Sequence, residues 1–209
     1  MPKGFEITIT NEEYDLIVTN IINEHKTMLI SLCREAQSKV NQTYTEVIKY
    51  GIENNGNEIL YVLDVKTGEN VFKPVTGTNN GIDSEELKEF LKNAKSDSLI
   101  VIHNHPNNAS FSTADIYSAL KYDSVSLTSA IGHDGSIYEL WIGNNTRNIP
   151  YEQLQTRYFE LKKELPINND YTVFSKLERE QMLRNDIIEI ICSENGWDYW
   201  RGYYFEEII

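Results

Sequence analysis

Two histidines one residue apart stand at the end of an apolar run, and a serine and an aspartate follow shortly after. Residues 99–116 have the sequence LIVIHNHPNNASFSTADI. Because the side chains of a strand alternate between its two faces, we expect His103 and His105 to point one way and Asn104 the other. Two such imidazoles, with Asp115 in the first turn of a following helix, can chelate one metal ion and leave a fourth position for water. This is the open ligand pattern of catalytic zinc.

Each part of this pattern also has a structural explanation. Ser112 and Asp115 have the spacing of a capping box, and a helix cap alone would account for both. Asn104, facing away from the histidines, fits a structural hydrogen-bonding role. His133 lies in GHDGS, a composition typical of a hairpin turn, and we expect it at the surface. The metal interpretation is favoured by the order of strand, His-x-His-Pro, short polar loop, Ser-x-x-Asp and helix.

The elements around this stretch alternate between strand and helix patterns, which predicts an α/β fold. Hydrophobic periodicity and turn residues predict a hairpin over 58–78, a helix over 83–94 capped by Asp83 or Ser84, a buried strand ended by Pro106, a helix after Ser112, and a second hairpin that turns at 133–135.

Helical patterns flank this central region on both sides. We expect an N-terminal helical extension over 1–43, a central domain over 44–149 and a C-terminal helical region over 150–209. Thr10-x-x-Glu13 has capping-box spacing, and apolar residues follow it at helical steps through Leu32. The aromatic run WDYWRGYYF, residues 197–205, either packs against the domain or forms a partner surface.

Charge and composition limit the partners and the compartment. The chain of 209 residues has 19 Lys and Arg against 32 Asp and Glu, a net charge of -13, which disfavours nucleic acid. No apolar run approaches the roughly 20 residues of a membrane span, and the first residues lack a secretory signal. Cys33 and Cys192 share no motif, which favours free thiols over a disulfide. We therefore expect a cytoplasmic protein that does not contact a membrane.

The residues quoted above resemble a known signature. A remote glutamate, His-x-His-Pro, a loop and Ser-x-x-Asp mark the JAMM (MPN-plus, JAB-type) zinc metallopeptidases, and HNHP is most similar to their prokaryotic and phage branches, which include RadC-like proteins. The resemblance covers residues 58–143, under half of the chain. It implies an MPN/JAB-type, cytidine-deaminase-like fold, in which helices flank a mixed, curved sheet.

The resemblance also implies roles for four residues. His103, His105 and Asp115 would hold Zn²⁺, and Ser112 would stabilise the oxyanion of the tetrahedral intermediate. The family places seven residues between the second histidine and the serine, whereas residues 106–111 make six here. This departure affects the donor geometry of Ser112 more than metal binding.

A glutamate upstream of the histidines completes the family's site. By the resemblance it takes a proton from water and passes it to the leaving amine. Glu58, which opens a strand before a hairpin, matches best, and Glu46 is the alternative.

The function implied is zinc-dependent hydrolysis of a peptide or isopeptide bond, with a protein or peptide as substrate, as in the deubiquitinating members. Two alternatives stay open. One is an MPN-like scaffold that binds a protein without chemistry. The other is a RadC-like role near DNA, which the net charge of -13 disfavours.

Overall fold

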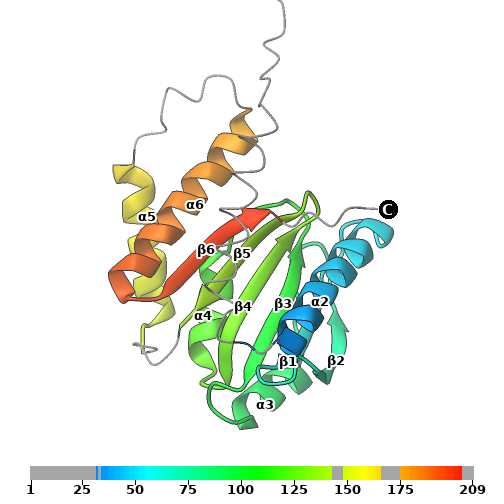
Figure 1. Cartoon of the computed structure of the whole chain (residues 1–209). Coiled ribbons are helices and arrows are strands. Elements are labelled where there is room, and N and C mark those ends of the chain that lie inside the picture. The colour runs from blue at the N-terminus through cyan, green and yellow to red at the C-terminus, as the bar shows by residue number, and fades with distance from the viewer. Residues whose placement is uncertain (1–31, 33, 143–147, 166–174, 204–209) are drawn as a thin grey trace, which may run out of the picture.

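Six strands form one mixed sheet with helices on both faces (Figure 1), which confirms the α/β class. This computed structural model describes residue 32 and residues 34–142, 148–165 and 175–203. The strands, in the sheet order β2-β1-β3-β4-β5-β6, are β1 (Ile59–Asp64), β2 (Asn70–Thr76), β3 (Leu99–His105), β4 (Val125–Gly132), β5 (Ser136–Trp141) and β6 (Asp198–Tyr203). The described helices are α2 (Arg34–Glu53), α3 (Glu85–Asn93), α4 (Thr113–Lys121), α5 (Tyr151–Glu164) and α6 (Lys176–Asn195). None of these helices has both the length and the apolar composition needed to cross a membrane.

The centre of the sheet is a parallel pair of strands. β3 and β4 run in the same direction and are joined by α4, whereas the other neighbouring strands are antiparallel. All seven residues of β3 are buried, as its apolar run predicts for a strand covered on both faces. In such α/β units, side chains that do chemistry gather beyond the carboxyl ends of the strands. His103 and His105 lie at that end of β3.

Alternation along β3 divides the core into two layers. Ile100 and Ile102 pack with α2 on one face of the sheet. Leu99 and Val101 pack with α3 and α4 on the other face. His103 and His105 continue the second series, so the histidines point to the α3 and α4 side while Asn104 points to the α2 side.

The helix before the sheet is longer than the sequence indicated. We expected the N-terminal helical extension to end at residue 43, but α2 continues to Glu53. Tyr44, Val47 and Gly51 extend its buried side at helical spacing, which keeps this helix on the sheet. The expected segment before Leu32, including Thr10, Glu13 and Cys33, lies outside the described residues.

The C-terminal region contains a strand as well as helices. We expected only helices there, but β6 pairs with β5 and completes the sheet. Trp200 packs on the α2 side of the sheet, and Tyr199 packs against the core on the other side. The part of the aromatic run that the structure describes therefore packs against the domain, which was one of the two predicted roles.

Several local predictions are confirmed. Ser84 rather than Asp83 caps α3, because its side chain accepts a hydrogen bond from the amide of Leu87 at 3.2 Å. The hairpins β1–β2 and β4–β5 are both present. α6 ends at Gly196, whose φ of 69° is the left-handed conformation that favours glycine at a helix end. Cys192 is a buried free thiol.

Candidate metal site

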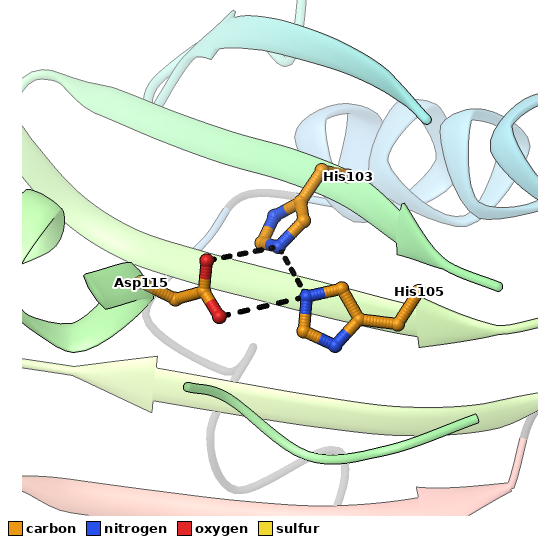
Figure 2. Close-up of side chains that lie close together, drawn as sticks. All are labelled: His103, His105 and Asp115. Carbon is orange, nitrogen blue, oxygen red and sulfur yellow. Dashed lines mark hydrogen bonds and ion pairs between the residues drawn. The ribbon is translucent and has the colours of Figure 1, made fainter. Parts of the chain in front are cut away.

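His103, His105 and Asp115 point toward one another at the end of β3 (Figure 2). Nε2 of His103 lies 2.9 Å from Nε2 of His105. The carboxylate of Asp115 places Oδ1 3.8 Å from His103 Nε2 and Oδ2 3.6 Å from His105 Nε2. Both histidines are buried, at 7% and 8% exposed. The three residues that the spacing pattern predicted as ligands therefore form one group.

The spacing of these atoms fits one metal ion. A tetrahedral zinc ion lies about 2.0–2.1 Å from its nitrogen and oxygen ligands, so two ligand atoms of such a site are roughly 3.3 Å apart. The three observed distances of 2.9, 3.6 and 3.8 Å lie on either side of that value. Two imidazoles and one carboxylate also leave one of four positions for another ligand. A buried group of this kind could hold a metal ion.

The loop after β3 orients the second histidine. Nδ1 of His105 lies 2.7 Å from the carbonyl oxygen of Ala109, which can only accept a hydrogen bond. Nδ1 must then carry the proton, and Nε2 presents its lone pair toward the group. Asn108 has a φ of 56°, a left-handed conformation that asparagine tolerates, and its amide donates to the carbonyl of His105 at 3.1 Å. The six-residue loop is therefore folded tightly enough to support the metal group.

Ser112 is the N-cap of α4, and it also holds Asp115. Its backbone amide and its hydroxyl donate to Asp115 Oδ2 at 2.6 and 2.7 Å. The amide of Asp115 donates back to Ser112 Oγ at 3.2 Å, which completes a capping box. The structural interpretation of the two residues is thus confirmed, and it is compatible with metal binding because Oδ1 of Asp115 takes no part in the cap. The single hydroxyl proton of Ser112 is given to Asp115 in this geometry.

Burial and charge give the ligands suitable protonation states. Burial lowers the pKa of His103, as does His105, against the opposing effects of Asp115 and the backbone of Ser129. Burial raises the pKa of Asp115, but the two histidines and the hydrogen bonds from Ser112 outweigh it and the pKa is lowered. A neutral imidazole and an ionised carboxylate are the forms that bind metals.

Glu58 lies on the same face of the sheet as the histidines. Leu60 pairs with His103 across the β1–β3 ladder, and Glu58 is two residues before Leu60, on the same side of β1. It is half-buried, and it lines the same cavity as Asp115. Burial, and next the charge of Asp115, raise the pKa of Glu58 from 4.5 to about 7. A carboxyl group with such a pKa is suited to proton transfer at neutral pH.

The other candidates lie away from this group. Glu46 is exposed on α2, which covers the opposite face of the sheet. Asn104 accepts a hydrogen bond from the amide of Ile59 at 2.7 Å and lies 3.0 Å from His133, as its predicted structural role requires. His133 lies in the turn between β4 and β5, as predicted, and it is partly covered because α2 comes so close at Gly51 that a Cβ there would meet its ring at 2.1 Å.

A cavity of about 730 Å³ opens beside the three ligands. Glu58 and Ser112 line it together with the metal group. Its aliphatic walls come from α3, β3, α4 and β4, through Leu87, Leu91, Val101, Ala119 and Val125. The site thus has space for an organic substrate with an apolar part.

The C-terminal elements support the loop that carries Ala109. Ser110 is fully buried, and its hydroxyl lies 2.8 Å from the hydroxyl of Tyr199 on β6. Gln181 on α6 donates to the carbonyl of Asn107. Neither contact could be predicted from the sequence, because they join residues 89 and 74 positions apart and no local pattern connects them.

No protein-family model, curated protein or solved structure matches this chain. The resemblance to the JAMM peptidases therefore stays a prediction that rests on this chain's own residues.

Proposed function

We propose that this protein is a zinc-dependent hydrolase of peptide or isopeptide bonds. The observation that carries the proposal is the presence of Glu58, with a pKa raised to about 7, in the cavity beside the group of His103, His105 and Asp115. Metal ligands alone would also suit a structural site. A carboxyl group that can exchange protons near pH 7 and does not belong to the ligand group suits hydrolysis.

The chemistry divides between the ion and the chain. Zinc, when bound by the three ligands, polarises the carbonyl of the scissile bond and lowers the pKa of water. Glu58 accepts a proton from the attacking water and delivers it to the leaving nitrogen, which balances the hydrolysis of an amide. His105 keeps its lone pair directed at the ion through its contact with Ala109.

Ser112 has two roles in this proposal. It holds the carboxylate of Asp115 in place through the cap. Because it also lines the cavity, a rotation of its hydroxyl away from Asp115 would direct the proton to the oxyanion.

The test is hydrolysis by zinc-loaded protein, screened on linear and isopeptide-linked peptide libraries. Glu58→Gln should keep zinc and lose about 10²–10⁴-fold in rate, because an amide cannot accept the proton. Glu46→Gln makes the same chemical change on the opposite face of the sheet and should leave the rate unchanged. A chelator should stop the wild-type reaction.

Two results would contradict the proposal. Absence of cleavage by zinc-loaded wild type across both libraries would favour a scaffold that binds proteins without chemistry. Equal rates for wild type and Glu58→Gln would remove Glu58 from the reaction.

A further inference from the structure

Arg184 lies where two cavities adjoin. It comes from α6, and it lines the 730 Å³ cavity of the metal group. It also lines a smaller cavity of about 140 Å³ between α4, α5 and α6. Ser112 and Arg184 are the two residues shared by both cavities. Arg184 therefore lines the cavity of the proposed reaction site, although it is 69 positions after Asp115 in the chain.

Within the described residues, Arg184 has neither an ion pair nor a hydrogen bond, and it is half-buried. Lys88, the other long cation of the cavity, is paired with Asp83 at 2.5 Å and Glu85 at 2.7 Å. Arg157 is likewise paired, with Glu194 at 2.6 Å. Among the described residues, Arg184 is thus a cation of this cavity without an acidic partner.

We propose that Arg184 binds a carboxylate of the substrate, and this inference rests on the proposed hydrolase function. A guanidinium group binds a carboxylate through two parallel hydrogen bonds, and a partly desolvated one gains most from such a partner. The carboxylate comes either from the free C-terminus of a peptide or from an acidic side chain. The aliphatic walls of the same cavity, which include Leu87 and Val101, receive an adjacent apolar side chain.

Binding of three peptides tests the proposal. The probes are acetyl-Ala-Ala-Leu with a free carboxylate, the same peptide as its carboxamide, and acetyl-Ala-Glu-Leu carboxamide. Calorimetry is done with zinc-loaded protein and again in EDTA, since the contact with Arg184 does not involve the metal. Arg184→Gln should weaken binding of a carboxylate peptide by about tenfold or more and leave the plain carboxamide unchanged. Loss for the first peptide identifies a C-terminal carboxylate, and loss for the third identifies a side chain.

Matched variants distinguish the loss of the Arg184 contact from unfolding and from a change in net charge. Arg34→Gln makes the same change on α2, across the sheet, and should bind all three peptides as wild type does. Arg184→Lys keeps the charge and should recover part of the affinity, and circular dichroism shows that each variant is folded. If wild type binds the carboxylate peptides no better than the carboxamide, or if Arg184→Gln binds all three as wild type does, the proposal is wrong. Failure to bind zinc would overturn the hydrolase function instead, and the measurements in EDTA would still decide the role of Arg184.

Discussion

The two imidazoles of the site face each other with little room between them. With His103 Nε2 and His105 Nε2 at 2.9 Å, their lone pairs repel unless a proton or a cation lies between them. Burial lowers the pKa of His103 and so favours its neutral form, whose one proton lies either on Nε2, where it is donated to His105, or on Nδ1, which leaves the Nε2 lone pair for a cation. Asp115 adds negative charge at 3.6 and 3.8 Å, which favours a cation. The group could therefore hold a cation when the proton of His103 lies on Nδ1.

We predict about one zinc ion per chain after purification without chelators. His103→Ala or Asp115→Ala should abolish the bound zinc, because each removes one of three ligands. Elemental analysis measures the ratio. His133→Ala provides the control, since His133 contacts Asn104 on the other side of β3 and should not affect zinc. Full zinc content in the His103→Ala, Asp115→Ala double variant would refute the site.

Glu58 makes the stability of the metal-free protein depend on pH. Its folded pKa of about 7 exceeds the ordinary 4.5, so the folded state holds the proton more tightly than the unfolded state. The free energy of unfolding therefore falls as pH rises from about 4.5 to 7. Because the half-buried side chain keeps part of its hydration, we expect a loss of about 1 kcal/mol.

In EDTA, Glu58→Gln should remove the fall in the free energy of unfolding between pH 4.5 and 7. The melting temperature of the variant should therefore exceed that of wild type at pH 8 and approach it at pH 4.5. Thermal unfolding at both pH values measures the effect. Glu46→Gln, at an exposed position, should follow wild type throughout. If the melting temperatures of Glu58→Gln and wild type change by the same amount between the two pH values, the raised pKa of Glu58 is contradicted.

At the scale of elements, the start of α4 serves the helix and the metal group at once. The capping box ties Ser112 to Asp115, and the same carboxylate faces the histidines. The position of the Asp115 carboxylate is therefore linked to the start of the helix. Asp115 could bind a metal ion while it takes part in the helix cap, so the structural and the metal interpretations of Ser112 and Asp115 are compatible.

We predict that Ser112→Ala lowers stability by about 1 kcal/mol through the lost cap, a fall of roughly 2–4 °C in melting temperature. Zinc should be retained, because Ser112 is not a ligand. Hydrolysis should fall by about 10²–10³-fold if the hydroxyl also serves the oxyanion. Ser175→Ala removes the equivalent cap of α6, outside the metal-site cavity, and should change stability alone. Equal rates for Ser112→Ala and wild type would restrict Ser112 to the cap.

Elements with a local pattern could be predicted, and those defined by distant partners could not. β3 and α4 were predicted correctly, because a continuous apolar run, a proline and a capping box are all short-range signals. The choice of Glu58 over Glu46 came from the resemblance, which implies a glutamate that opens a strand before a hairpin. β6 was missed because its pairing with β5 joins Ser136 to Tyr203 across two intervening helices. Arg184 was missed for the same reason, since only the packing of α6 brings it to the cavity.

At the scale of the whole molecule, β6 contacts the loop that supports the metal group. β6 lies at the edge of the sheet beyond β5 (Figure 1). The hydroxyl of Tyr199 on β6 lies 2.8 Å from the hydroxyl of Ser110 in that loop. This loop supplies the carbonyl of Ala109 that orients His105. The sheet is therefore both the scaffold of the ligands and the means by which a C-terminal segment positions them.

We predict that Tyr199→Phe weakens zinc binding by about tenfold while keeping its stoichiometry. The variant leaves the buried hydroxyl of Ser110 without its partner, which loosens the support of the histidine ligand. Competition with a zinc chelator measures the affinity. Tyr117→Phe removes the same atom from a tyrosine of α4 that packs on Tyr151, and it should bind zinc as wild type does. An unchanged affinity for Tyr199→Phe would show that the loop holds its geometry alone.

The contact between Ser110 and Tyr199 also sets an order of events during translation. The two residues are 89 positions apart, so at about 5–20 residues per second the ribosome adds Tyr199 roughly 4 to 18 seconds after Ser110. In that interval the nascent chain has both histidines and Asp115, but its loop lacks the partner on β6. Metal acquired early would bind an incompletely supported group and exchange readily. If Tyr199 supports the loop as predicted, tight metal binding begins only after β6 has been added to the sheet.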